Sequence, residues 1–236
     1  RRDLLCPEDH PYRNTGNSLR DISQFTVEDV LAFHRKWYGP NNATLHVAGD
    51  FDPAQTKQWI EKYYGEIESG PPPEDPEPYP LTLESLELAY TEDELAPAPR
   101  LSVSFPTVEQ YHPDWYALRY LAEFLASEKR GPLYQVIVEE QGLAPSVTTS
   151  QTRQEIAGRF DIDVRAFADV DLDKVRSAIE EGLQRFGPEA LTREDVERIR
   201  AGIETRFFDY YSGLSGKSQM LAEYNAQTGS PAFVTE

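Results

Sequence analysis

Apolar residues recur at helical spacing in several stretches of the chain, and some of these stretches open with a recognisable cap. Thr26–Asp29 and Thr192–Asp195 both have the spacing of a capping box, with Asp as the second member. A helix is expected after each box. Further helices are predicted at 53–64, 114–125, 132–140, 171–186 and 214–227. The helix at 53–64 is expected to bury Trp59, Ile60 and Tyr63.

Alternation of apolar and polar residues predicts the strands. The clearest case is 157–166, where Phe160, Ile162, Val164 and Ala166 alternate with polar neighbours. Shorter or weaker alternation predicts strands at 44–49, 81–90, 101–105 and 146–152. A block of strands is followed by a block of helices, with few parallel crossovers. This order indicates an α+β fold, a two-layer α/β sandwich with a mainly antiparallel sheet and helices on one face.

A proline-rich segment divides the chain. Residues 69–80 contain six prolines in twelve positions, and such a stretch can neither continue a helix nor join a central strand. A subdomain boundary is therefore predicted there, with one part at 1–68 and the other at 81–236.

Charge and cysteine content exclude several classes of protein. The 41 acidic residues outnumber the 23 basic ones and give a net charge of −18, which argues against nucleic-acid and anionic-membrane partners. An ordinary acidic bacterial protein and a protein from a high-salt organism both have this character.

Cys6 is the only cysteine, so an internal disulfide is excluded. No apolar run reaches the ~20 residues that cross a bilayer. The bacterial periplasm and the cytoplasm fit equally.

Catalytic chemistry is not apparent in the motifs. His10, His34, His46 and His112 have no second histidine at ligand spacing, so each is interpreted structurally, His10 as part of a turn or a disordered end. Cys6 has no basic neighbour that would lower its pKa, and there is no nucleophile elbow or P-loop. We therefore assign no catalytic and no metal-ligating residue in this chain.

Short motifs along the chain nevertheless resemble the insulinase/pitrilysin family of zinc metallopeptidases, which includes the mitochondrial processing peptidase. The most informative block is 38–53, a turn followed by an alternating run and a capped helix start. The other matching motifs are His10–Tyr12, Thr26–Val30, His112–Leu118, Gly131–Tyr134, Gly142–Ala144 and Thr192–Asp195. Their order and spacing together carry the resemblance.

The resemblance implies a LuxS/mitochondrial processing peptidase-like fold and a place for this chain within it. Residues 1–68 would be the C-terminal part of a first peptidase subdomain, 69–80 the linker, and 81–236 a second, inactive subdomain. The family's His-x-x-Glu-His motif and its third zinc ligand would precede Arg1. Zinc is therefore expected in the parent protein, while this chain alone is expected to bind no zinc and to cleave nothing.

Two positions bear on which half of the enzyme this is. In the zinc-free half of such enzymes, an Arg and a Tyr help to bind substrate, and the matching positions here hold Val138 and Pro145. The chain therefore fits the zinc-bearing half better.

The resemblance also implies an exosite that anchors the substrate's N-terminus. It would comprise Glu128 and Gly131 in a loop and Val147 and Thr148 on a nearby strand, where a substrate strand could add to the sheet. An ordinary turn with a solvated Glu128 is the alternative.

The parent is accordingly expected to be a zinc metalloendopeptidase that hydrolyses peptides or small unfolded proteins in a closed chamber. This chain would supply scaffold and chamber wall, with a peptide substrate and a second homologous half as partners. A non-catalytic homologue serving as a structural subunit is the alternative, and an unrelated α+β binding module is a more distant one.

Overall fold

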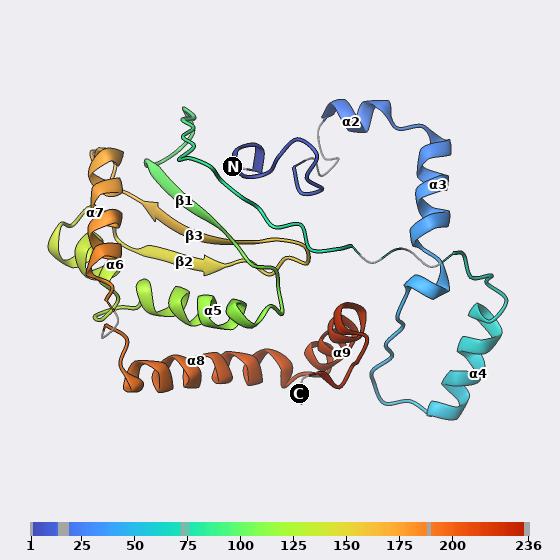
Figure 1. Ribbon diagram of the computed structural model, residues 1–236. Helices are drawn as coiled ribbons and strands as arrows, with labels where there is room; N and C mark the ends of the chain where they lie inside the picture. Colours follow the sequence, from blue (N-terminus) through green and yellow to red (C-terminus); the bar gives the residue numbers. More distant parts are fainter. Residues whose placement is uncertain (1, 14–18, 72–73, 75, 188–189, 234–236) are drawn as a thin grey trace. The chain divides into compact units, whose positions relative to one another are not determined.

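The computed structural model describes residues 2–13, 19–71, 74, 76–187 and 190–233 of the chain (Figure 1). The chain forms two compact units. Unit 1 contains residues 1–15 and 76–202, and unit 2 contains residues 16–75 and 203–236. The chain therefore passes between the units three times, at 15–16, 75–76 and 202–203.

A small antiparallel sheet forms the centre of unit 1. Its strands β1 (Arg100–Thr107), β2 (Val147–Gln151) and β3 (Gly158–Arg165) are arranged in the order β1-β3-β2. Ile162 of β3 is paired with Val103 of β1 and with Thr149 of β2, which fixes the register. Three of the predicted strands, those at 101–105, 146–152 and 157–166, are thereby confirmed, as is the antiparallel pairing.

The helices of unit 1 supply the other side of its core. They are α5 (Pro113–Leu125), α6 (Pro132–Tyr134), the π-helical η2 (Gln135–Glu140) and α7 (Leu172–Arg185), with the first part of α8 (Arg193–Tyr211). Side chains from α5, α6, η2 and α7 meet alternate residues of β3 in one buried cluster, which includes Leu125, Leu133, Val136, Ile137, Phe160, Ile162, Val164, Val175 and Ile179. The alternating pattern places the apolar residues of a strand on one face, and the 3.6-residue pattern does the same for a helix. These apolar faces pack against each other in this cluster.

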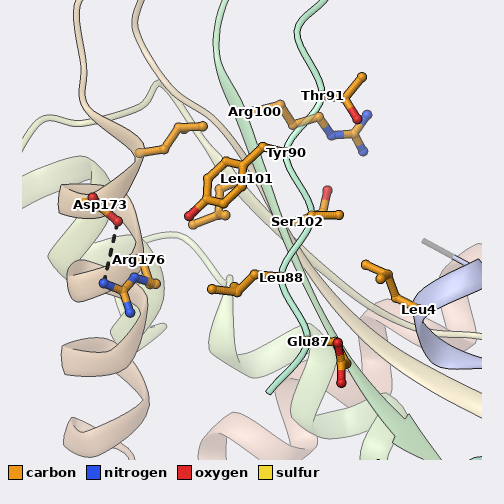
Figure 2. A pocket seen from close by; sticks show the side chains of 12 residues that line it. Leu4, Glu87, Leu88, Tyr90, Thr91, Arg100, Leu101, Ser102, Asp173 and Arg176 are labelled. Carbon is orange, nitrogen blue, oxygen red and sulfur yellow. Dashed lines mark ion pairs between the residues drawn. The ribbon is translucent and has the colours of Figure 1, made fainter. Parts of the chain in front are cut away.

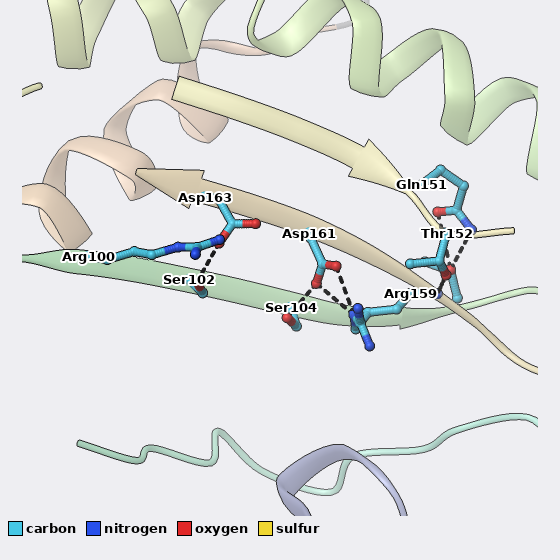
Figure 3. Close-up of polar contacts among 9 residues, drawn as sticks. Arg100, Ser102, Ser104, Gln151, Thr152, Arg159, Asp161 and Asp163 are labelled. Atoms are coloured by element: carbon cyan, nitrogen blue, oxygen red, sulfur yellow. Dashed lines mark hydrogen bonds and ion pairs between the residues drawn. The ribbon is translucent and has the colours of Figure 1, made fainter. Parts of the chain in front are cut away.

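The remaining residues of β3 carry a polar network instead (Figure 3). Asp161 is almost fully buried, and its carboxylate accepts from Ser104 Oγ at 2.5 Å and from Arg159 Nε at 2.8 Å. Asp163 accepts from Ser102 and from Arg100 Nη2, the latter at 2.8 Å. Buried carboxylates are tolerated when they are paired in this way.

The first residues of the chain pack into unit 1. Helix α1 (Arg2–Leu5) and the turn that follows bury Leu5, Cys6 and His10. His10 Nδ1 accepts from the Tyr12 amide at 3.0 Å, so Nε2 carries the proton and donates to Tyr79 O at 3.0 Å. Tyr12 Oη accepts from the Glu155 and Ile156 amides at the β2–β3 turn. The expectation of a turn at His10 is correct, but that of a disordered end is wrong because long-range contacts order it.

All regular secondary structure in the described residues of unit 2 is helical. It contains α2 (Leu19–Gln24), α3 (Val27–Trp37), the 3₁₀ turn η1 (Pro40–Asn42), α4 (Pro53–Tyr64), the last part of α8 and α9 (Leu214–Thr228). The capping box at Thr26 is confirmed, with both reciprocal hydrogen bonds to Asp29 present. Asp52 caps α4, with Pro53 as its first residue.

The expected burial of Trp59 and Tyr63 on α4 is wrong in this structure. Their side chains are 53% and 67% exposed, and α3, α4 and α9 bury no residue. Helical spacing predicts which face is apolar but does not supply the layer that would cover it.

Two predicted strands, 44–49 and 81–90, are also absent from the structure as described. Alternation marks a segment that is able to be a strand, whereas a strand exists only when a neighbour accepts its backbone hydrogen bonds. Unit 2 contains no strand within its described residues, so 44–49 has no partner there.

The proline-rich segment is partly described. Residues 72, 73 and 75 of the predicted linker 69–80 lie outside the described residues. Its described members contain no helix or strand, as expected from their proline content.

Candidate substrate-contact site

The predicted exosite loop connects α5 to α6 and is tightly turned. Lys129 has a left-handed backbone with φ 68°, and its carbonyl accepts from Gln135 Nε2 at 2.9 Å. Gly131 is the N-cap residue of α6, and its amide donates to Ser127 O at 2.8 Å. A Cβ on Gly131 would lie 2.5 Å from Leu125 O. Gly131 is therefore a structural requirement of the loop, because only glycine allows this approach.

Arg130 ties this loop to the start of α8 through Asp195. Arg130 Nη2 lies 3.0 Å from Asp195 Oδ2, and Arg198 Nη2 lies 3.2 Å from Oδ1. Asp195 is only 1% exposed and also completes the second predicted capping box, in which the Asp195 amide donates to Thr192 Oγ1 at 3.2 Å.

The carboxyl of Asp195 stays ionised because its partners outweigh its burial. Burial raises the pKa of Asp195, whereas the hydrogen bonds from Thr192 and Arg198 and the charge of Arg130 lower it. The net result is a pKa below the ordinary value. This buried anion holds Arg130, and with it the backbone next to Glu128, in one place.

The two strand residues of the predicted exosite face opposite ways. Val147 is buried in the core cluster and pairs with Val164. Thr148 is exposed, and its Oγ1 donates to Asp163 O at 3.3 Å on the polar side of the sheet. Because side chains alternate along a strand, only Thr148 is available to a ligand. β2 is an outer strand of the described sheet, so its backbone is the second available feature.

The structure therefore separates the four predicted residues by role. Glu128 and Thr148 are exposed and available for contact, while Gly131 and Val147 are buried and maintain the fold. Asp195 was missed as a support of the loop. Its position in a capping box was visible in the sequence, but its pairing with Arg130 depends on how the chain folds.

Metal chemistry is not supported by the described residues. Within them, no three His, Cys, Asp or Glu side chains are grouped as a metal site requires. His112 caps α5, where its Nδ1 accepts from the Asp114 amide at 3.1 Å. His46 Nε2 is buried without a hydrogen-bond partner. The described side chains do not fit a zinc centre, so no catalytic step is assigned to them.

No helix in the described parts of the chain has the length and apolarity to cross a membrane.

The sequence of residues 24–203 matches the family described as "Peptidase M16 inactive domain". These are 180 of the 236 residues. The chain belongs to the peptidase M16 family. The resemblance to insulinase-type zinc peptidases is thereby confirmed, for a segment without the His-x-x-Glu-His motif.

Curated relatives of this M16 chain are named as proteases. It is 24% identical to presequence protease 1 of Arabidopsis thaliana over 213 residues, covering 86% of this chain and 20% of the relative. It is 20% identical to the zinc protease PqqE of Helicobacter pylori over 221 residues, covering 92% of this chain and 50% of the relative. The chain thus spans half or less of these relatives.

Solved structures agree on the fold of this M16 chain. A protease from Helicobacter pylori superposes with a TM-score of 0.78 at 19% identity, over 92% of this chain and 54% of that one. A peptidase M16 inactive domain from Pseudomonas fluorescens superposes with a TM-score of 0.72 at 17% identity, over 99% of this chain and 55% of that one. At these identities, the likeness establishes the fold alone.

Proposed function

We propose that this chain is the non-catalytic part of a zinc metalloendopeptidase that hydrolyses peptides or small unfolded proteins. The observation that carries the proposal is the match of residues 24–203 to the M16 inactive domain. The zinc ligands and the general base belong to the remainder of the parent protein. This chain contributes scaffold and part of the wall of a closed chamber around the peptide.

The proposed architecture assigns each part of the chain to a peptidase subdomain. In this proposal, residues 1–68 complete a first subdomain, 69–80 link it, and 81–236 form a second, two-layer α/β sandwich with helices on one face. The compact units of the structure differ from this division at both ends, because 1–15 belong to unit 1 and 203–236 to unit 2. The exposed apolar side chains of α3 and α4 support this assignment. Phe33, Trp59 and Tyr63 are more than half exposed, which indicates a missing layer in unit 2. In the proposed architecture, the rest of the first subdomain supplies that layer.

The test compares this chain with the longest natural polypeptide that contains it. We expect the longer polypeptide to retain one zinc ion per molecule after dialysis and to cleave a fluorogenic peptide, because the zinc centre lies outside this chain. The 236-residue chain should do neither. Stoichiometric zinc or cleavage by the short chain would contradict the proposal.

The second candidate is a non-catalytic homologue that serves as a structural subunit. It is motivated by the structure of complex III2 from Candida albicans, one chain of which superposes with a TM-score of 0.72 at 17% identity, over 90% of this chain and 51% of that one, so the same fold occurs within a larger complex. A longer polypeptide that neither binds zinc nor cleaves peptide would support this candidate.

The proposed exosite uses the exposed carboxylate of Glu128 to bind the N-terminal ammonium of a peptide. The loop is held by Arg130 and Asp195, and the outer edge of β2 accepts the peptide backbone. Glu128→Ala in the longer, active polypeptide should raise KM for peptides with a free N-terminus roughly three- to tenfold, as expected for losing one charge-assisted hydrogen bond of ~1 kcal/mol.

N-terminally acetylated peptides provide the control for Glu128→Ala, since they have no ammonium group and their KM should not change. Glu155→Ala, on the exposed surface of the β2–β3 turn, is the matched control variant. An equal rise in KM for free and acetylated peptides, or no rise for either, would remove Glu128 from the exosite.

A further inference from the structure

The segment Leu86–Thr91 has the pattern of a strand but no strand partner in the described structure. Leu86, Leu88 and Tyr90 alternate with Glu87, Ala89 and Thr91. The three large apolar side chains are 74%, 58% and 83% exposed. Three such side chains on one side of an extended segment are unusual on a protein surface.

A pocket of about 600 Å³ separates this segment from the start of β1 (Figure 2). One wall is formed by Glu87–Thr91 and the opposite wall by Arg100, Leu101 and Ser102. The N-terminal part of α7 contributes Leu172, Asp173 and Arg176. β1 is an outer strand of the described sheet, so the backbone on this side of it has no strand partner there.

Figure 2 shows that the segment runs alongside β1 in the opposite direction, with Tyr90 near Leu101 and Glu87 farther along the strand. This is the arrangement of a hairpin whose loop is 92–99. The connection is short enough to hold the segment at a high effective concentration beside β1.

We infer that Leu86–Thr91 is a strap that closes onto β1 as an additional antiparallel strand and fills this pocket. The register follows from the two faces of β1. Pairing Tyr90 with Leu101, Leu88 with Val103 and Leu86 with Phe105 places apolar residues opposite apolar ones. The polar side of β1 then meets Thr91, Ala89 and Glu87, opposite Arg100, Ser102 and Ser104.

A shift of one residue would reverse this match, because it would place Leu88 and Tyr90 on the polar face beside Asp161 and Asp163. Leu101 and Val103 already pack against the core cluster. Closure in the stated register therefore extends the core over Leu88 and Tyr90. It also protects an outer strand edge that would otherwise accept a strand from another chain.

Disulfide trapping tests the closed state in a chain carrying Cys6→Ser, which removes the only native thiol. In the closed state, the variant Ala89→Cys/Ser102→Cys has its two cysteines at directly paired positions. Their Cα atoms would then be about 4.5–5.5 Å apart, which is within the range that a disulfide can bridge. The control Thr91→Cys/Ser104→Cys places them on the same face but four residues out of register. Mild oxidation should crosslink the first variant at least tenfold faster than the control.

Hydrogen exchange measured by mass spectrometry tests closure in the unmodified chain. Amides of 86–91 should exchange at least tenfold more slowly than in an unstructured peptide. Leu88→Lys should abolish that protection while amides of β3 remain protected, because a charge on the core face prevents closure but leaves the sheet intact. Equal crosslinking of the two cysteine pairs, or unprotected amides at 86–91 in the unmodified chain, would overturn the proposal. These readouts concern unit 1 alone and do not depend on peptidase activity.

Discussion

Replacing Gly158 with alanine is expected to destabilise unit 1 severely. A Cβ at this position would lie 1.8 Å from Val108 O and 2.8 Å from Val108 C, which are backbone atoms next to β1. Backbone atoms are less able to move aside than the end of a flexible side chain. Gly158 pairs with Thr107 at the first position of β3, so the displacement would be transmitted to the sheet. We expect the free energy of unfolding to fall by about 3 kcal/mol.

Urea unfolding followed by Trp115 fluorescence would measure this loss. Trp115 is buried in unit 1, whereas Trp37 and Trp59 lie in unit 2. A background with Trp37→Phe and Trp59→Phe therefore reports on unit 1 alone. Gly187→Ala is the matched control, because its Cβ would meet no atom within 4 Å, and it should be neutral or stabilising by ~0.4–1 kcal/mol. Equal unfolding midpoints for the two variants would contradict the close approach at Gly158.

Leu133→Ala is expected to have a similarly large effect through a different mechanism. Leu133 is fully buried at the start of α6 and packs against α7 at Gly182, where a Cβ would lie only 2.8 Å from Leu133 Cδ2. Truncation removes apolar contacts and leaves a cavity that the surrounding helices only partly fill. The expected loss is about 3 kcal/mol in the free energy of unfolding, within the range for buried Leu→Ala changes.

The same fluorescence assay checks Leu133→Ala against two companions. Leu95→Ala, at a side chain that is 91% exposed, should change stability by less than ~0.5 kcal/mol. The double variant Leu133→Ala/Gly182→Ala should be less destabilised than the sum of its parts, because the new methyl group occupies space that Leu133 vacates. Strict additivity would show that the two positions do not share this contact.

Local sequence signals were reliable where the structure is decided by neighbours along the chain. The two capping boxes at Thr26 and Thr192 form the predicted hydrogen bonds because their partners are three residues away. The alternation around Ile162 predicted both the strand β3 and its buried face, since successive side chains point to opposite faces. The helices at 53–64 and 171–186 were predicted within a residue or two of their observed bounds.

Local sequence signals do not predict the residues of the proposed exosite or the contacts that support its loop. The sequence could name Glu128 and Thr148 only through the family resemblance, and their use by a substrate remains a prediction. The pairing of Arg130 with Asp195 does not follow from spacing, because it joins groups 65 positions apart that meet only after the loop and α8 have packed.

The sequence by itself determined the family, the positions of most helices and strands, and the absence of a recognisable zinc motif in these residues. Only the tertiary structure decided which elements find partners. His10 is ordered by Tyr12 and Tyr79, while the apolar faces of α3 and α4 stay exposed and 44–49 has no strand partner among the described residues. The physical reason is the same in each case: propensity and periodicity are properties of a segment, whereas burial and strand pairing are properties of two surfaces that must meet.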